Sequence, residues 1–153
     1  MATPTQEDAK LLLQLYDLRR ETRLRRARDF VGKQCKFKDY EDFKKRYPER
    51  SQGAAHVAMA LGYWDLACIL AAKGLVNAEL FNESNFEHVS MWFRLKPVIE
   101  GWRKEWNFPT MMVSMETMAE RHPSAAMFKQ YMQAQAPAQP TGGSRRGGKK
   151  GKT

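Results

Sequence analysis

The sequence contains few residues of the kinds that build cross-linked or metal-dependent sites. It has two cysteines, Cys35 and Cys68, and three histidines among 153 residues. The cysteines form neither a CxxC motif nor a disulfide framework, which favours a reducing compartment. No histidine has a second metal ligand at a suitable spacing, so we expect no metal and no other cofactor.

The sequence also lacks the common catalytic motifs. It has no P-loop, no GxGxxG, no GxSxG and no paired-carboxylate motif. Arg50 and His56 have an Arg-x5-His spacing that looks like the loose signature of a small helical ribonuclease family, which uses an Arg and a His across a dimer. Roughly one such match is expected by chance in a chain of this composition. The sequence therefore favours a protein that is not an enzyme.

Nothing at the start of the chain resembles a targeting segment. The opening MATPTQEDAK has no apolar stretch behind a basic start, so we expect no signal peptide and a cytoplasmic protein. Residues 54–72 are apolar over a length that could span a bilayer, and only His56 and Asp65 are clearly polar. A central Asp costs about 2.5–3.5 kcal/mol on insertion scales. We therefore expect a buried core helix and no membrane contact.

Helical periodicity is present along most of the chain, and no segment alternates like a strand. Thr5 with Asp8 resembles a capping box, Ser51 is a helix N-cap residue, and Gly74 is a stop signal. These signals predict an all-α, single-domain helical bundle of about six helices over residues 6–135. The expected helices cover residues 6–32, 39–47, 51–73, 84–105, 110–121 and 124–135.

Charged residues interrupt two apolar helical faces. Asp65 falls among the apolar residues of the central helix, and Arg20 and Arg23 fall on an apolar face of the first helix. Because a buried carboxylate is costly without a cation or several donors, we predict a structural ion pair between these residues. If Asp65 is buried and paired, Asp65→Asn should cost about 2–4 kcal/mol. The alternative is an anion pocket in which Asp65 orients the guanidinium groups.

Three segments of the chain carry a family resemblance. They are LLLQLYDLRRETRLRRAR, YWDLACILAAKGL and MWFRLKPVIEGWRKEW. They resemble a family of small bacterial helical proteins known only as a domain of unknown function, in which residues like Tyr16, Leu18, Arg19 and Arg20 and like Tyr63, Trp64 and Asp65 recur. The resemblance covers about residues 9–122 and implies a cytosolic helical domain. It implies no activity, substrate or catalytic residue.

The C-terminal segment, residues 136–153, is rich in Pro, Gly, Lys and Arg and has no large apolar side chain, so we predict that it is disordered. Of the net charge of +9, +5 comes from residues 137–153 and +4 from residues 1–136. Flexible cations can contact phosphates without sequence preference. The candidate nucleic-acid contacts are Arg145, Arg146, Lys149, Lys150 and Lys152.

Three functional hypotheses remain. The first is a non-enzymatic interaction or scaffold protein, with a protein partner or a homodimer formed through the start of the first helix, where Leu11, Leu15 and Leu18 make a second apolar stripe. The second is an accessory protein that binds nucleic-acid phosphates through the tail and the Arg-rich first helix. The third is a helical ribonuclease using Arg50 and His56, which requires both side chains to converge on one cleft.

Overall fold

The computed structural model describes residues 2–136, and the secondary structure in this range is entirely helical. The helices are α1 (Gln6–Arg19), α2 (Thr22–Lys33), α3 (Tyr40–Arg46), α4 (Gln52–Ala72), α5 (Ala78–Ser84), α6 (Glu87–Glu105), α7 (Val113–Glu120) and α8 (Ala125–Gln135). The all-α prediction is confirmed. The predicted number of helices is wrong, because one expected helix is split and because residues 78–84 form a helix of their own.

The split falls in the first expected helix, between α1 and α2. Arg20 ends α1, and Glu21 has φ −54° and ψ 138°, outside the helical region. The Glu21 carboxylate accepts a hydrogen bond from the Leu24 N–H at 3.0 Å and thereby caps α2. A continuous helix would have placed Arg20 and Arg23 on one apolar face. Because the chain turns between α1 and α2, the two residues do not share a helical face.

Most of the other expected start and stop signals are used. The Thr5 hydroxyl accepts from the Asp8 N–H at 3.2 Å while the Asp8 carboxylate accepts from the Thr5 N–H at 2.7 Å, which is a capping box. The Ser51 hydroxyl accepts from the Ala54 N–H at 3.2 Å at the start of α4. Gly74 follows α4 with φ +72°, a conformation that glycine adopts without strain. Pro97 lies inside α6 and does not divide it.

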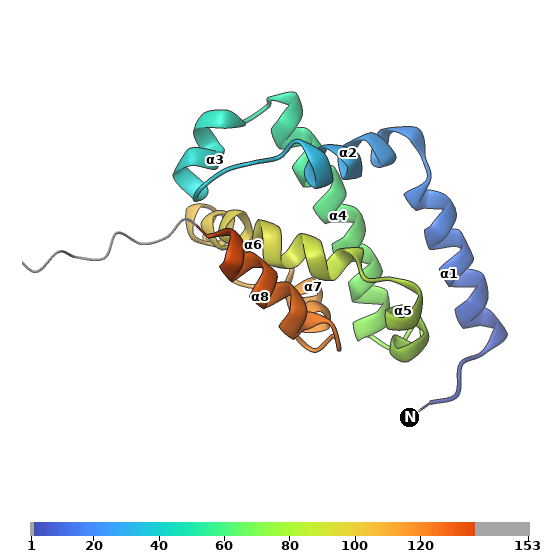
Figure 1. Ribbon diagram of the computed structural model, residues 1–153. Helices are drawn as coiled ribbons and strands as arrows, with labels where there is room; N and C mark the ends of the chain where they lie inside the picture. Colours follow the sequence, from blue (N-terminus) through green and yellow to red (C-terminus); the bar gives the residue numbers. More distant parts are fainter. Residues whose placement is uncertain (1, 137–153) are drawn as a thin grey trace, which may run out of the picture.

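The bundle is assembled around α4 and α6 (Figure 1). Helices α2 and α7 pack against α4, while α3, α7 and α8 pack against α6. Trp64 of α4 and Trp92 of α6 are both fully buried and belong to one hydrophobic core. Among the described residues, α4 is the one helix long and apolar enough to cross a bilayer by length and composition.

Helix α1 lies at the edge of the bundle (Figure 1). Its N-terminal end is attached where the Asn77 N–H donates to the Asp8 carboxylate at 2.7 Å, and its C-terminal half where the Tyr63 hydroxyl donates to the Leu15 carbonyl at 2.7 Å. Leu15 is buried, whereas Leu13 and Leu18 are exposed. Self-association through α1 stays a prediction.

Candidate functional site

The predicted ion pair between the first helical segment and Asp65 is wrong. Arg20 and Arg23 are exposed, and no salt bridge within residues 2–136 involves Asp65. The turn between α1 and α2 is the physical reason, because it directs both arginines to solvent. The anion pocket based on the same three residues is absent for the same reason.

Asp65 lies instead near the start of α7. Its side chain is half-buried, and one carboxylate oxygen, Oδ1, has no hydrogen-bond partner among residues 2–136. Burial raises the pKa of the Asp65 carboxyl above its ordinary value, while the Met115 backbone N–H and the Arg103 guanidinium oppose this shift. Met115 belongs to the first turn of α7, whose N–H groups favour a nearby negative charge. These contacts offset only part of the cost of burying the Asp65 carboxylate, because its pKa stays raised.

We expect Asp65→Asn to leave the free energy of unfolding at pH 7 unchanged or to raise it by up to about 1 kcal/mol. A carboxyl whose pKa is raised by folding is less stable as a carboxylate in the folded state than in the unfolded state, so the neutral amide removes an unfavourable charge. Urea unfolding of the variant, with the exposed Asp17→Asn as control, measures the effect. A decrease in the free energy of unfolding of more than about 2 kcal/mol would contradict this expectation and would indicate that Asp65 is a buried, paired carboxylate.

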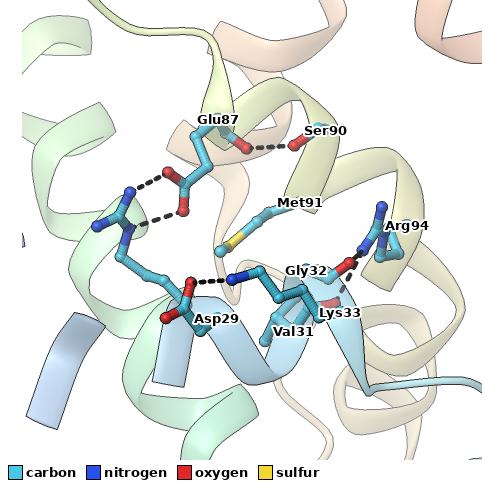
Figure 2. Close-up of a pocket in the computed structure, with 9 residues that line it drawn as sticks. Asp29, Val31, Gly32, Lys33, Glu87, Ser90, Met91 and Arg94 are labelled. Atoms are coloured by element: carbon cyan, nitrogen blue, oxygen red, sulfur yellow. Dashed lines mark hydrogen bonds and ion pairs between the residues drawn. The ribbon is translucent and has the colours of Figure 1, made fainter. Parts of the chain in front are cut away.

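Partly buried ion pairs do join separate helices, but they are made by other residues than those predicted. Arg28 of α2 binds Glu87 of α6 through two hydrogen bonds, the one from Nε being 2.8 Å long (Figure 2). The Trp64 indole donates to the same carboxylate at 3.3 Å. The hydrogen bond to Glu87 raises the pKa of the Arg28 guanidinium. This bidentate pair fixes α2 against α6.

A hollow of about 230 Å³ lies beside this pair, between α2 and α6 (Figure 2). Arg94 reaches across it from α6 and donates to the carbonyl groups of Val31 and Gly32 at 2.8 and 2.9 Å. These carbonyls belong to the last turn of α2, where acceptors lack helical partners and a cation is favourable. Arg94 therefore has backbone acceptors at this hollow, and it makes no ion pair within residues 2–136.

A larger hollow of about 600 Å³ adjoins the first and shares Gly32, Lys33 and Arg94 with it. We call this larger hollow the cationic groove. It lies between the end of α2, the loop after α2, α6 and α8, and none of the described residues that line it is an Asp or a Glu. The cations that line it are Lys33, Lys36, Lys38 and Arg94, and its aromatic residues are Phe37, Phe93 and Tyr131.

Three of these four cations are outside ion pairs. Lys36, Lys38 and Arg94 make no ion pair within the range that the structure describes, whereas the Lys33 ammonium lies 3.3 Å from Asp29. The Lys38 backbone N–H donates to the Asp42 carboxylate at 2.9 Å, so a carboxylate lies close to Lys38. Tyr131 is 54% exposed, so one face of the groove offers an aromatic ring to solvent. The groove combines the two features that single-stranded nucleic acid requires, namely cations along a channel and an exposed ring.

The sequence contains a signal for this groove that the helix-by-helix reasoning missed. Residues 19–38 hold nine Lys or Arg and two Asp or Glu, although residues 1–136 have a net charge of only +4. The remainder of the described chain is therefore mildly acidic. The helical periodicity of a single helix does not include Lys36 and Lys38, because both lie in the loop after α2. The net charge summed over a window of about twenty residues along the sequence identifies residues 19–38 as the most basic part of residues 1–136.

Arg50 and His56 do not meet in one cleft. Arg50 lines a hollow between α3, α4 and α6, whereas His56 lines another hollow beside α2. The His56 ring packs against Phe30 with 5.3 Å between ring centroids. The two side chains therefore line separate hollows within one chain, and a ribonuclease that uses this pair stays a prediction.

The other two histidines form a buried aromatic cluster. His88 is fully buried against Trp64, Phe81 and His122, and within the described part of the chain neither of its ring nitrogens has a hydrogen-bond partner. Burial, and secondarily His122, lower the pKa of His88 to about 4. Residues 2–136 contain no group of three or more His, Cys, Asp or Glu placed to hold a metal ion. His88 is therefore a neutral part of the core at pH 7.

The five tail residues predicted to contact nucleic acid, Arg145, Arg146, Lys149, Lys150 and Lys152, lie outside the described residues. Helix α8, which leads to them, ends at Gln135, and Gln135 itself lines the cationic groove. The tail therefore starts at the groove.

Comparison with known proteins supports the resemblance carried by the sequence motifs. Searches of curated proteins and of solved structures gave no match. The family described as domain of unknown function DUF4760 matches residues 4–122, which include α1 to α7. This match spans most of the chain and contains the predicted segment, residues 9–122. The chain therefore belongs to the DUF4760 family.

Proposed function

We propose that this protein is a non-enzymatic interaction protein that binds the phosphate backbone of single-stranded nucleic acid in the cationic groove. The observation that carries the proposal is a groove lined by four cations and by no carboxylate. Phosphate contacts of this kind release counterions and bind with little sequence preference. The proposal joins two of the sequence-based hypotheses, since it describes an interaction protein whose partner is a nucleic acid.

The composition of the groove favours a single strand over a duplex. The exposed Tyr131 offers a ring on which an unpaired base can stack, and such stacking is sequence-tolerant because every base has a flat face. Phe37 also lines the groove, but its ring is half-buried against the core. Bases in a duplex are already stacked and are not accessible to the Tyr131 ring. The tail supports the proposal as well, because its five cations follow a helix that ends at the groove.

The test is a salt titration of binding to a fluorescent oligouridine, with the variant Lys36→Glu/Lys38→Glu and the control Lys73→Glu/Lys104→Glu. Both control residues are exposed, neither lines the groove, and the two variants have the same net charge. We expect the groove variant to bind at least about tenfold more weakly and with a flatter salt dependence, since each lost phosphate contact reduces the slope by about 0.7.

Two outcomes would contradict the proposal. Equal affinities of the groove variant and the control variant would show that only overall charge matters. Equal affinity of the protein for anionic lipid vesicles and for the oligonucleotide would show a general preference for negatively charged surfaces. Melting temperatures of the two variants must match, so that a folding defect is not mistaken for lost binding.

A further inference from the structure

Helix α4 has an apolar face that no other part of the described chain covers. Asp65 is the only Asp, Glu, Lys or Arg in this helix, yet only 39% of its most apolar stretch is buried. Met59 and Leu66 are 40% and 50% exposed. A helix that is apolar on all sides is normally buried on all sides. We call the uncovered side the open face of α4, and its residues are Ala55, Ala58, Met59, Gly62, Leu66 and the half-buried Ile69.

Gly62 lies at the midpoint of the open face. It is the central residue of the 21 in α4, and a Cβ added there would meet no neighbouring atom within 4 Å inside the described part of the chain. Glycine in the middle of a helix is less favourable than alanine, and no contact within residues 2–136 requires it here. A residue without a side chain lets another backbone approach closely. This position therefore favours a contact with a second molecule.

The sizes of the side chains on the two sides of Gly62 indicate which molecule makes this contact. The N-terminal half of the open face carries the small side chains of Ala55 and Ala58, whereas the C-terminal half carries the large ones of Leu66 and Ile69. A second copy of α4 that crosses the first in the antiparallel direction at Gly62 places Leu66 of each copy over Ala58 of the other. The same arrangement places Ile69 over Ala55. A two-fold contact makes each pair twice, so the face is complementary to itself.

The small half of the open face also forms one wall of the hollow that Arg50 lines between α3, α4 and α6. This hollow has a volume of about 510 Å³. We call it the aromatic groove, because Tyr40, Phe43, Tyr47, Trp102 and Trp106 line it. Trp106 is 57% exposed and stacks on Trp102 with 5.3 Å between ring centroids. In the antiparallel arrangement, the large side chains of the second copy enter this groove.

Charge and area both agree with a second copy as the occupant. Two cations and two carboxylates line the aromatic groove, namely Lys44, Arg50, Glu49 and Glu105, so these residues have no net charge and do not favour an ionic partner. The open face covers roughly 300 Å², taken as a helix about 31 Å long and about 10 Å wide, whereas each partner of a stable interface buries about 800 Å². A stable dimer therefore needs the aromatic groove as well, and the antiparallel arrangement includes it.

We propose that two copies of this chain pair through the open face of α4. The two helices are antiparallel and cross at Gly62, and Leu66 and Ile69 of each copy occupy the aromatic groove of the other. The flexible side chain of Met59 borders the contact and adapts to it. The inference goes beyond the proposed function and does not depend on it, because no residue of the cationic groove lies on the open face or lines the aromatic groove.

The first test measures the mass of the full chain by sedimentation over a hundredfold range of concentration. We expect a monomer–dimer equilibrium in the parent, and we expect Gly62→Leu to weaken it at least about tenfold because the new side chain occupies the crossing point. Gly32→Leu is the matched control. Gly32 is an exposed helical glycine outside the open face, and a Cβ added there also meets no neighbouring atom within 4 Å. The control should dimerise like the parent.

The second test exchanges a large and a small side chain. Leu66→Ala should weaken the dimer by leaving a hole, and Ala58→Leu should weaken it by placing two leucines against each other. The double variant Ala58→Leu/Leu66→Ala should recover most of the affinity, because each leucine again faces an alanine. The double variant has the same composition as the parent, so a general apolar attraction does not explain a recovery.

Three results would overturn the proposal. The first is a parent that stays monomeric over the whole range, or that binds neutral lipid vesicles through Leu66 instead of dimerising. The second is equal dimer affinity of Gly62→Leu and Gly32→Leu, which would place association on another surface such as α1. The third is a double variant no tighter than the single variants. Circular dichroism and melting temperatures of all variants at a concentration where the parent is monomeric verify that they are folded.

Discussion

Replacing Arg28 by methionine should lower the free energy of unfolding by about 2–3 kcal/mol. The substitution keeps the apolar stem and removes the only cation paired with Glu87 within residues 2–136, leaving a carboxylate between α2 and α6. Removing one partner from a fully buried pair costs about 3–5 kcal/mol. We expect less here because the side chains of Arg28 and Glu87 remain 20% and 26% exposed. Urea unfolding at pH 7 measures the loss.

A matched control for Arg28→Met lies one turn away on the same helix. Lys33→Met breaks the ion pair with Asp29, whose two side chains are 74% and 58% exposed, and should change stability by less than about 0.5 kcal/mol. The double variant Arg28→Met/Glu87→Met should recover much of the loss, because it leaves no unpaired charge. If Arg28→Met is no more destabilised than Lys33→Met, the pair does not hold α2 against α6.

The second large effect is a loss of stability in mild acid caused by His88. The pKa of His88 is about 4 in the folded state, against 6.5 for an ordinary histidine. Between these two pH values the unfolded chain is protonated at His88 and the folded chain is not. The stabilisation is complete above about pH 6.5 and falls as the pH approaches 4. Linkage predicts a loss of about 2–3 kcal/mol between pH 7.5 and pH 4.5.

The control for this effect is His88→Leu. Both ring nitrogens of His88 lack hydrogen-bond partners in the part of the chain that the structure describes, so leucine removes the titrating group without breaking a hydrogen bond there. The difference in unfolding free energy between parent and variant, measured by urea unfolding at each pH, isolates the contribution of His88 from that of the carboxyl groups. A difference that does not change between pH 7.5 and pH 4.5 would show that His88 is not protonated on unfolding in this range.

Local signals in the sequence were sufficient to predict several helix ends. Thr5 with Asp8, Ser51 and Gly74 are short-range features, and each marks a helix end in the structure. The break at Glu21 was missed because no Gly or Pro marks it and because Glu is an uncommon N-cap residue. Because the prediction lacked this break, it assigned the residues after Glu21 to the wrong helical faces relative to those of α1.

The partners of charged residues were harder to predict than the helices. Periodicity indicates which face of a helix is buried, but not which distant residue meets it. Arg28 and Glu87 are 59 positions apart, and their contact depends on how α2 and α6 lie against each other. Asp65 was correctly recognised as a carboxylate in an apolar environment, but its neighbours come from α7 and α6 instead of from the first helical segment.

The decisive experiment for the proposed function is to locate bound nucleic acid on the folded chain. Backbone amide signals of the ¹⁵N-labelled protein would be followed while oligouridine is added at moderate salt. We predict that the signals of Lys36, Phe37, Lys38 and Tyr131 shift, while those of α5 do not, since no residue of α5 lines the cationic groove. Shifts confined to residues 137–153, or absent from the groove at saturation, would contradict binding in the cationic groove.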